Sequence, residues 1–519
     1  MAQTQDTASG MDNHLLLAPT DTKMAKVLDE AIKLLDYYPE IVQRIRQDQE
    51  HDAKKSKLPR VLNKRWEEEQ TLPLPLQELL ATERGDLVAE DLELKVGRPR
   101  LKAEVVYLFM ALRGCYGSVC SQDSWDRISD SLTLRYYLDP YMNRLPGRTT
   151  VLENLNAVSE ATRSFILDCQ LSHILDSGLD DFLKQTIDST SVDANSAWPT
   201  ELHLIKSLLN DAYRLGQRLD HFGVQNFRQW HVPNWLKELE GLEFEVNLSS
   251  RGKRREFKKN YRKFVAKAVK IVDYLAGEYE RFEDLVDGMD LMPSLRACLT
   301  RLWDRLGSDL GESYILLEYT AERVLGSGDT SREAHEEIYS VSDRSARFIK
   351  KGGRKTIFGY KIQLGRSANG FISSVIVPEG NAADSDQLLR MVLDHLKRTG
   401  VLPGLVSTDD GYSSAIGRNA VIELGVKDVS ISGSKGKKLT PEEDWASETY
   451  SQARSDRSAV ESLMFTGKHC FEFGQFHRRG IDSVRCEMLE KVMAYNFWRI
   501  GYERARQAKE SMQNCRQAA

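Results

Sequence analysis

The sequence predicts an α+β chain of several domains, built around a mixed β-sheet with helices on both faces. The chain has 519 residues, which is too long for one simple domain. Long segments carry apolar residues at helical spacing, whereas the segment after residue 340 alternates short strand-like runs with helices. One β-branched run, 183–192, stands alone before a long helical block. We therefore expect an N-terminal helical domain before the sheet and a helical insertion after its first strand.

These changes of pattern divide the chain into five predicted parts. Short helices joined by tight turns and basic loops precede the first strand, and they suit a helix-turn-helix-like DNA-binding module and an ordinary helical bundle equally well. The parts are an N-terminal tail and helix, 1–55; a helical DNA-binding domain, 56–180; the mixed-sheet core, 181–200 and 341–500; the helical insertion, 201–340; and a C-terminal tail, 501–519.

Composition narrows the class of protein. The net charge is −5, so the chain as a whole does not indicate nucleic-acid binding, and local charge must decide. Seven cysteines, with no pair spaced C-x-x-C, argue against a zinc ribbon or a disulfide framework and fit a reducing cytoplasm. No run of 18 apolar residues and no secretory signal pattern occur, so we expect neither a membrane span nor export.

The core elements follow in order after residue 340. "TIFGYKIQL" (356–364) and "FISSVIV" (371–377) flank an Asn-Gly turn and predict an antiparallel hairpin. "DSDQLLRMVLDHLKRTG" predicts a helix with Asp384 as its N-cap and Gly400 as its end. "LPGLVSTDD" and "VKDVSIS" predict two further strands, and "SQARSDRSAVESLMFTGKH" predicts a helix.

With the helical block removed, this is the strand order of a ribonuclease-H-like core. In that arrangement the first and fourth strands are neighbours. Asp188, inside the first strand, is then expected near Asp409 and Asp410, which end the fourth. The last helix crosses the sheet and can present Glu461 to the same point.

Three converging carboxylates indicate a metal site, because they repel one another unless a cation lies between them. Hard oxygen ligands select Mg²⁺ or Mn²⁺. Two such ions about 4 Å apart can activate a water or a 3′-hydroxyl and stabilise the leaving oxygen of a phosphodiester. One of Asp409 and Asp410 is expected to be a ligand, and the other a turn residue or helix cap.

The acid motifs "QTIDSTSV", "TDDGYSS" and "RSAVESLMFTGK" resemble those of the DDE transposases of bacterial insertion sequences, in particular the ISNCY-like group. The register of that resemblance selects Asp409 over Asp410, giving Asp188, Asp409 and Glu461 as catalytic, metal-binding residues with two Mg²⁺ or Mn²⁺ ions. It also implies that Arg457 and Lys468, on the helical face of Glu461, contact DNA. Arg454 stands where the family usually has a tyrosine.

A basic segment in the insertion predicts further DNA contacts. Residues 251–270 hold ten Lys or Arg and one Glu. Phe257, Tyr261 and Phe264 belong to an apolar stripe, so the basic residues are expected on the opposite face, where they can neutralise phosphates. The alternative is a solvated helix face. The predicted contacts are Lys253, Arg254, Arg255, Lys258, Lys259, Arg262 and Lys263.

Together these features predict a DNA transposase acting on terminal inverted repeats and target DNA. The resemblance implies a homodimer or higher assembly on DNA, in a bacterial cytoplasm and at the nucleoid when active. The alternatives are a ribonuclease-H-like nuclease without strand transfer and a transposase-derived DNA-binding protein. Trp198 as a base-stacking residue, and Arg478 and Arg479 as backbone contacts, are further candidates, each with an ordinary structural role as its alternative.

Overall fold

The computed structural model divides into two compact units. Unit 1 holds 1–52, 96–195 and 345–519, and unit 2 holds 53–95 and 196–344. The predicted domain boundaries are not tested by this division and stay predictions. The residues that the structure describes are 22–70, 92, 100–116, 122–196, 200–221, 231–250, 252, 254–286, 292–326, 339–350 and 356–518.

A six-stranded mixed sheet forms the centre of unit 1. Its strands are β1 (Lys184–Asp193), β2 (Arg347–Ile349), β3 (Ile357–Ser367), β4 (Ile372–Ile376), β5 (Leu405–Thr408) and β6 (Asp428–Ile431). The order is β2-β3-β1-β5-β6, and β4 also pairs with β3. β3 runs antiparallel to β1 and β4, whereas β5 is parallel to both β1 and β6. The expected pairing of the first and fourth strands is present, and the order is consistent with a ribonuclease-H-like core.

Helices cover both faces of this sheet, as the sequence predicts. On one face, Ile187 and Val406 pack against apolar residues of α14 (Leu388–Thr399) and α15 (Ala415–Glu423). On the other face, the Ser407 hydroxyl donates to the Ala453 carbonyl in α18 (Glu448–Asp456), and α19 (Ser458–Cys470) contacts β1. The short helices η2 (Asp384–Asp386), η3 (Asp410–Tyr412), α16 (Ser434–Leu439) and α17 (Glu442–Ala446) complete the connections.

The hairpin and the helix after it show where local patterns hold. Gly370, with φ of 88°, turns the chain between β3 and β4, so the predicted Asn-Gly hairpin is confirmed. Gly400, with φ of 71°, ends α14 as predicted. The prediction of Asp384 as the N-cap is wrong. Gln387 occupies that position, because Asp384 lies in η2 and accepts hydrogen bonds from a neighbouring strand instead.

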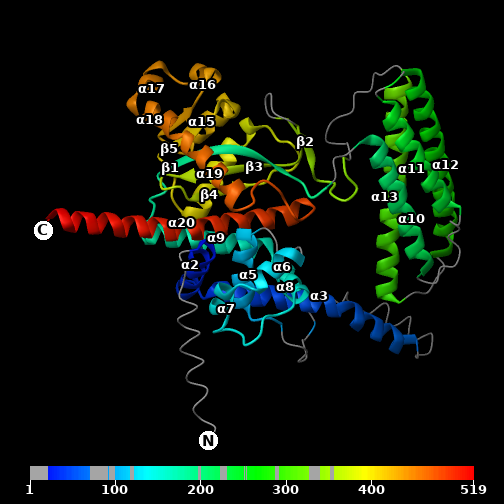
Figure 1. Cartoon of the computed structure of the whole chain (residues 1–519), viewed down its shortest axis with the longest axis horizontal. Coiled ribbons are helices and arrows are strands. Elements are labelled where there is room, and N and C mark those ends of the chain that lie inside the picture. The colour runs from blue at the N-terminus through cyan, green and yellow to red at the C-terminus, as the bar shows by residue number, and fades with distance from the viewer. Residues whose placement is uncertain are drawn as a thin grey trace, which may run out of the picture. The chain divides into compact units, whose positions relative to one another are not determined.

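The N-terminal helices of unit 1 pack on a long C-terminal helix, α20 (Ile481–Ala518), which also contacts β4 (Figure 1). α5 (Ala103–Tyr116) is apolar around almost its whole circumference and is buried. The other helices of this region are α2 (Lys23–Tyr37), α3 (Glu40–Gln70, which continues into unit 2), α6 (Gln122–Ser129), α7 (Leu132–Leu138), α8 (Arg148–Ala157) and α9 (Glu160–Asp176). DNA binding by this region stays a prediction.

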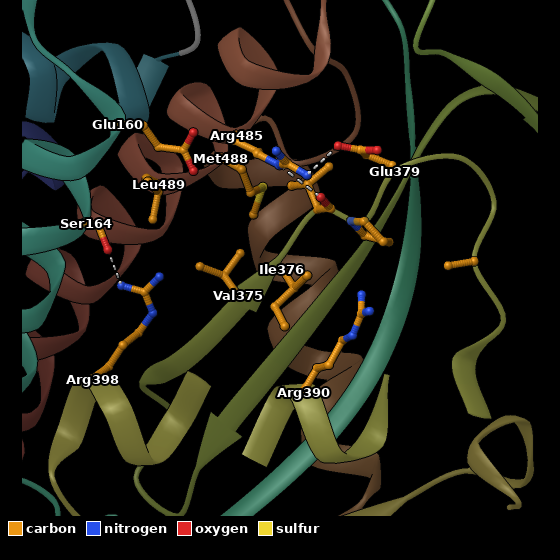
Figure 2. Close-up of a pocket in the computed structure, with 13 residues that line it drawn as sticks. Glu160, Ser164, Val375, Ile376, Glu379, Arg390, Arg398, Arg485, Met488 and Leu489 are labelled. Carbon is orange, nitrogen blue, oxygen red and sulfur yellow. Dashed lines mark hydrogen bonds and ion pairs between the residues drawn. The ribbon is translucent and has the colours of Figure 1, made fainter. Parts of the chain in front are cut away.

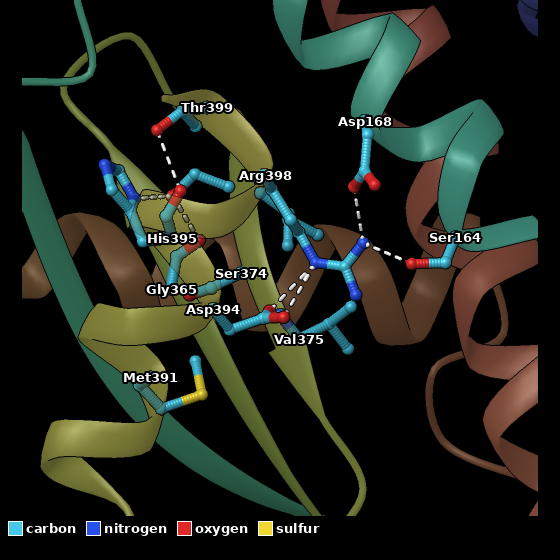
Figure 3. Close-up of polar contacts among 12 residues, drawn as sticks. Ser164, Asp168, Gly365, Ser374, Val375, Met391, Asp394, His395, Arg398 and Thr399 are labelled. Atoms are coloured by element: carbon cyan, nitrogen blue, oxygen red, sulfur yellow. Dashed lines mark hydrogen bonds and ion pairs between the residues drawn. The ribbon is translucent and has the colours of Figure 1, made fainter. Parts of the chain in front are cut away.

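A buried arginine joins α9 to the sheet layer (Figure 3). Arg398 of α14 donates to Asp394 on its own helix, and to Asp168 and Ser164 on α9. His395, one turn earlier, shares a hydrogen bond with the Ser373 hydroxyl of β4. α14 is therefore held from both sides, and it supports the face of the sheet beneath β1 and β5.

Unit 2 contains a bundle of four helices, which Figure 1 shows in green. They are α10 (Glu201–His221), α11 (Val232–Ser249), α12 (Arg254–Val286) and α13 (Pro293–Leu325). Their apolar faces form one buried cluster that includes Leu209, Leu239, Phe264 and Leu306. The predicted apolar stripe of α12 is therefore core, as its spacing indicates.

Candidate active site

An aspartate inside one strand lies beside an aspartate that directly follows the neighbouring parallel strand. β1 and β5 pair with Thr186 opposite Ser407. Continued for two residues, this register brings Asp188 level with Asp409, the residue that follows β5. Adjacent parallel strands lie about 4.8 Å apart, so the two backbone positions are close although they are far apart in sequence.

Alternation along the strands decides which way these aspartates point. Side chains two residues apart share a face, so Asp188 and Asp409 share the face of Thr186 and Ser407. That is the face on which Ser407 contacts α18 and on which α19 lies against β1. The helix that carries Glu461 therefore covers the side of the sheet to which both aspartates belong.

The adjacent acids Asp409 and Asp410 have different roles in the fold. Asp410 Oδ1 accepts from the backbone N–H groups of Lys435 and Gly436, each at 2.9 Å, and from the Ser413 hydroxyl. Burial acts to raise the pKa of Asp410, but these hydrogen bonds outweigh it and lower the pKa. Asp409 Oδ1 accepts a local bond from Gly411 N at 3.0 Å. Asp410 thus holds the start of α16, whereas Asp409 shapes only its own turn.

The third acid, Glu461, lies in the first turn of α19 and its side chain is 64% exposed. Its Oε1 is 3.4 Å from Arg457 Nη2, one turn earlier. Within the described part of the chain, no group of three or more His, Cys, Asp or Glu side chains is arranged to hold a metal ion. The structure brings Asp188 and Asp409 together and does not gather Glu461 into the same cluster.

An exposed aromatic residue shares the outer face of α19 with these charged groups. Phe465 is 66% exposed and lies one turn after Glu461, and its ring is 4.2 Å from that of His469. Lys468 is exposed on the same face. Val460 and Leu463 bury the opposite face, so this outer face presents a guanidinium, a carboxylate, a ring and an ammonium group together.

Behind the two aspartates, a buried tyrosine lies close to both of them. Burial raises the pKa of Tyr412 well above its usual value, and the negative charges of Asp384, Asp188 and Asp409 raise it further. All three carboxylates are therefore near its hydroxyl. The Tyr412 hydroxyl donates to Gln363 Oε1, and Gln363 Nε2 donates to Asp384 Oδ1 at 2.7 Å. The sequence argument missed this use of Asp384, although polar Lys361 and Gln363 in the otherwise apolar run of β3 are a signal for it.

Residues 329–497 match the family model described as transposase DDE domain. The chain therefore carries a transposase DDE domain. The matched segment includes β3 to β6 and α19, with Asp409 and Glu461, whereas β1 and Asp188 precede it. No curated protein and no solved structure matches the chain. None of the described helices is both long and apolar enough to cross a membrane.

The predicted DNA contacts on α12 are largely exposed. Arg254, Arg255, Lys259, Arg262 and Lys263 are exposed, and Lys258 is half-buried. Lys263 is 3.9 Å from Glu245 of α11, and Lys267 pairs with Glu238 of the same helix. Acids of α11 therefore neutralise the later part of the basic row, and its first turns keep the greatest excess of positive charge.

Four other candidates have different outcomes. Lys253 and Trp198 lie outside the described residues. The guanidinium of Arg478 is largely buried and lies 3.7 Å from the carboxylate of Glu490, which agrees with the ordinary structural role that was its alternative. Arg479 is exposed in part and donates to the Asn195 carbonyl. The sequence could not separate these adjacent arginines, since both follow the same helix.

A cavity of about 450 Å³ in unit 1 lies away from the aspartates (Figure 2). It is bounded by β4, α14, α9 and α20, and Arg390, Arg398 and Arg485 line it. Arg398 is turned to Ser164, and Arg485 lies 3.6 Å from Glu379. None of the three acids, Asp188, Asp409 and Glu461, lines this cavity, so it is separate from the candidate active site.

Proposed function

We propose that this transposase binds the ends of an insertion sequence, cuts DNA there and joins the freed 3′-hydroxyl to target DNA. The observation that supports the proposal most directly is the parallel register that makes Asp188 and Asp409 neighbours beside α19. The ISNCY-like group and assembly as a homodimer or higher on DNA belong to the same proposal, and both rest on resemblance.

The donor set suits Mg²⁺ or Mn²⁺. Asp188, inside β1, and Asp409, directly after β5, offer carboxylate oxygens from neighbouring strands, and both side chains are half-buried, so they are accessible to an ion from solvent. Such ions, when bound, activate a water or a 3′-hydroxyl and stabilise the leaving oxygen. Glu461 would complete the ligand set as the third carboxylate, which requires it to part from Arg457.

The α19 face has a defined part in this reaction. Arg457, once released from Glu461, and Lys468 would hold DNA phosphates close to the bond that is cut. Phe465 offers a ring against which a base beside that bond can stack. Arg254, Arg255, Lys259 and Arg262 of α12 would contact phosphates further along the same DNA.

Substitution of one aspartate in the pair at 409 and 410 tests the proposal. Asp409→Asn is expected to abolish Mn²⁺-dependent cleavage of a DNA fragment that carries the element's terminal repeat. The affinity of the variant for that fragment, measured by fluorescence anisotropy, should stay within about twofold of wild type, which is well under the roughly 1.4 kcal/mol that a tenfold change represents. Asp410→Asn is the matched control, because the amide oxygen can still accept from Lys435 and Gly436. Cleavage by Asp409→Asn at the wild-type rate would contradict the assignment.

A pre-cut end separates the proposal from its two alternatives. With the 3′-hydroxyl already exposed, the wild-type chain is expected to produce joined products in the presence of Mn²⁺. Cleavage without joining identifies a nuclease. Specific end binding with neither reaction identifies a transposase-derived DNA-binding protein.

A further inference from the structure

A chain of buried polar side chains lies behind the two aspartates. The Ser189 side chain hydrogen-bonds the Tyr412 hydroxyl. That hydroxyl donates to Gln363 Oε1, and Gln363 Nε2 donates to Asp384. Lys361 Nζ lies 2.9 Å from the same Asp384 oxygen. We call these five residues the 189–412–363–384–361 network.

The hydrogen bonds of this network run in a defined direction. Lysine only donates and a carboxylate only accepts, so Asp384 is the acceptor at which the chain ends. Gln363 must then point its NH₂ group at Asp384 and its oxygen at Tyr412, which leaves the tyrosine hydroxyl as donor. Gln363 and Tyr412 are fully buried, and Ser189 and Lys361 almost so. Loss of one member therefore leaves buried groups without partners.

The network lies on the opposite face of the sheet from the aspartates. Ser189 is paired with Gln363 across β1 and β3, so the two side chains share a face. Asp188 is one residue earlier and therefore points the other way. The network contacts the chain on both sides of the site, because Ser189 directly follows Asp188 and Tyr412 follows the turn made by Asp409 and Gly411.

Asp384 lies directly against that turn. A Cβ placed on Gly411 would be 3.0 Å from Asp409 Oδ1 and 3.5 Å from Asp384 Oδ2. Both carboxylates therefore border the same space beside Gly411, and like charges so placed repel each other. Lys361, which also donates to the Ala382 carbonyl, supplies the positive charge that offsets Asp384. Asp384 can thus anchor the network without joining the acids on the other face.

We propose that the 189–412–363–384–361 network holds the middle of β1 and the turn after β5 at the separation that lets Asp188 and Asp409 bind one divalent cation together. Tyr412 and Asp384 are accordingly positioning residues, and they do not touch the reacting atoms. The inference rests on the proposed function, since it concerns the same cation site.

Removal of a single hydroxyl group tests the inference. Tyr412→Phe is expected to weaken Mn²⁺ binding to the full chain, followed by electron paramagnetic resonance of free Mn²⁺, by about ten- to hundredfold, the range typical for outer partners of metal ligands. The Mn²⁺ concentration that gives half-maximal cleavage should rise by the same factor. Binding of end DNA without metal should not change.

Tyr450→Phe is the matched control. Tyr450 is equally buried, and its hydroxyl bonds the backbone of Val429 at the outer strand β6. The variant removes the same group and the same kind of hydrogen bond in the same unit, so its melting temperature should fall by a similar amount. A purely structural role for Tyr412 predicts equal Mn²⁺ affinities for the two variants, and that result would overturn the inference.

A second pair of variants keeps the test decisive if Tyr412→Phe does not fold. Asp384→Asn keeps an oxygen that accepts from Gln363 and Lys361, and it should bind Mn²⁺ within a few-fold of wild type. Asp384→Ala removes the acceptor and should lose as much Mn²⁺ affinity as Tyr412→Phe. Equal Mn²⁺ affinities of Asp384→Asn and Asp384→Ala would contradict the inference. Asp409→Asn distinguishes failure of the proposed function from failure of the network proposal. If Asp409→Asn binds Mn²⁺ as wild type does, the proposed function fails. If Asp409→Asn loses Mn²⁺ binding but the Tyr412 and Asp384 variants keep it, only the network proposal fails.

Discussion

Glu490 is a completely buried carboxylate that three arginines surround. Arg113 Nε and Arg163 Nε lie 2.7 and 2.6 Å from its oxygens, and Arg478 lies further away at 3.7 Å. Burial alone would raise the pKa of Glu490, but the guanidinium charges, first that of Arg113, lower it to about 2. These interactions join α5, α9 and α20 through one residue.

Stability should therefore depend on pH through Glu490. Its pKa is lower in the folded chain than in the unfolded one, so its contribution is fully present above about pH 4.5 and is lost as the pH falls towards 2. Glu490→Gln is expected to lower the free energy of unfolding at pH 7 by about 3–5 kcal/mol, because the arginines keep their charges without a partner. Urea unfolding between pH 2.5 and 7 measures this, with exposed Glu423→Gln as control. A variant as stable as wild type at pH 7 would contradict the assignment.

At the scale of elements, α5 and α20 cross so closely that their backbones nearly touch. A Cβ on Gly114 of α5 would be 2.0 Å from the carbonyl oxygen of Glu490 and 3.0 Å from Ala494 Cβ. Only glycine fits at this crossing, because the obstacle is backbone that cannot rotate away. The N-terminal helices are thereby held directly against the helix that supports the sheet.

Gly114→Ala is expected to destabilise unit 1 by about 1–3 kcal/mol or more, the cost of forcing an extra carbon into a packed interior. Gly501→Ala on α20 is the control, since its nearest neighbour atoms are 3.5 Å away and alanine favours the helix. Thermal melting of the two variants measures the difference. If both melt at the wild-type temperature, the close crossing is incorrect.

At the scale of the whole molecule, a chain of net charge −5 is proposed to bind DNA, so the positive charge must be concentrated locally. The first turn of α12 carries Arg254 and Arg255, where the helix dipole favours acids. Their charge therefore does not stabilise the helix. This arrangement favours a role in binding phosphates over that of an ordinary solvated face.

The salt dependence of end binding tests this role. The test variant carries Gln in place of four basic residues of α12, Arg254, Arg255, Lys259 and Arg262. The slope of log K against log salt should become shallower by roughly 0.9 for each DNA phosphate that the variant no longer neutralises. The total change is about 3–4 if all four side chains touch DNA. Lys267→Gln is the control, because Lys267 already pairs with Glu238. An unchanged slope for the fourfold variant would mean that α12 faces away from DNA.

Much of the catalytic core could be predicted from local patterns. The period of two in 356–364, the Asn-Gly turn after it and the glycine at 400 are local signals, and the strand β3, the hairpin and the end of α14 that they predict all appear where they were expected. The acids Asp188 and Asp409 could be recognised because the first and fourth strands of the expected strand order are neighbours. The apolar stripe of α12 likewise follows from helical spacing alone.

Other features depended on partners that lie far away in the sequence. Asp384 has the spacing of a helix cap, but Lys361 and Gln363 of β3 bind it instead. Arg478 and Arg479 are adjacent, yet one is buried beside Glu490 and the other donates to Asn195. No local pattern contains these partners, so no local pattern could assign the roles.

The sequence by itself therefore determined the elements, their apolar faces and the acids inside the first strand and after the fourth, because backbone periodicity and turn chemistry act over a few residues. Only the tertiary structure decided that Asp410 binds the start of α16, that Asp384 anchors a buried network, and that Glu461 stays paired with Arg457. Those outcomes depend on which charges and hydrogen-bonding groups meet after the chain has folded, and burial makes each unpartnered group costly enough to select its partner.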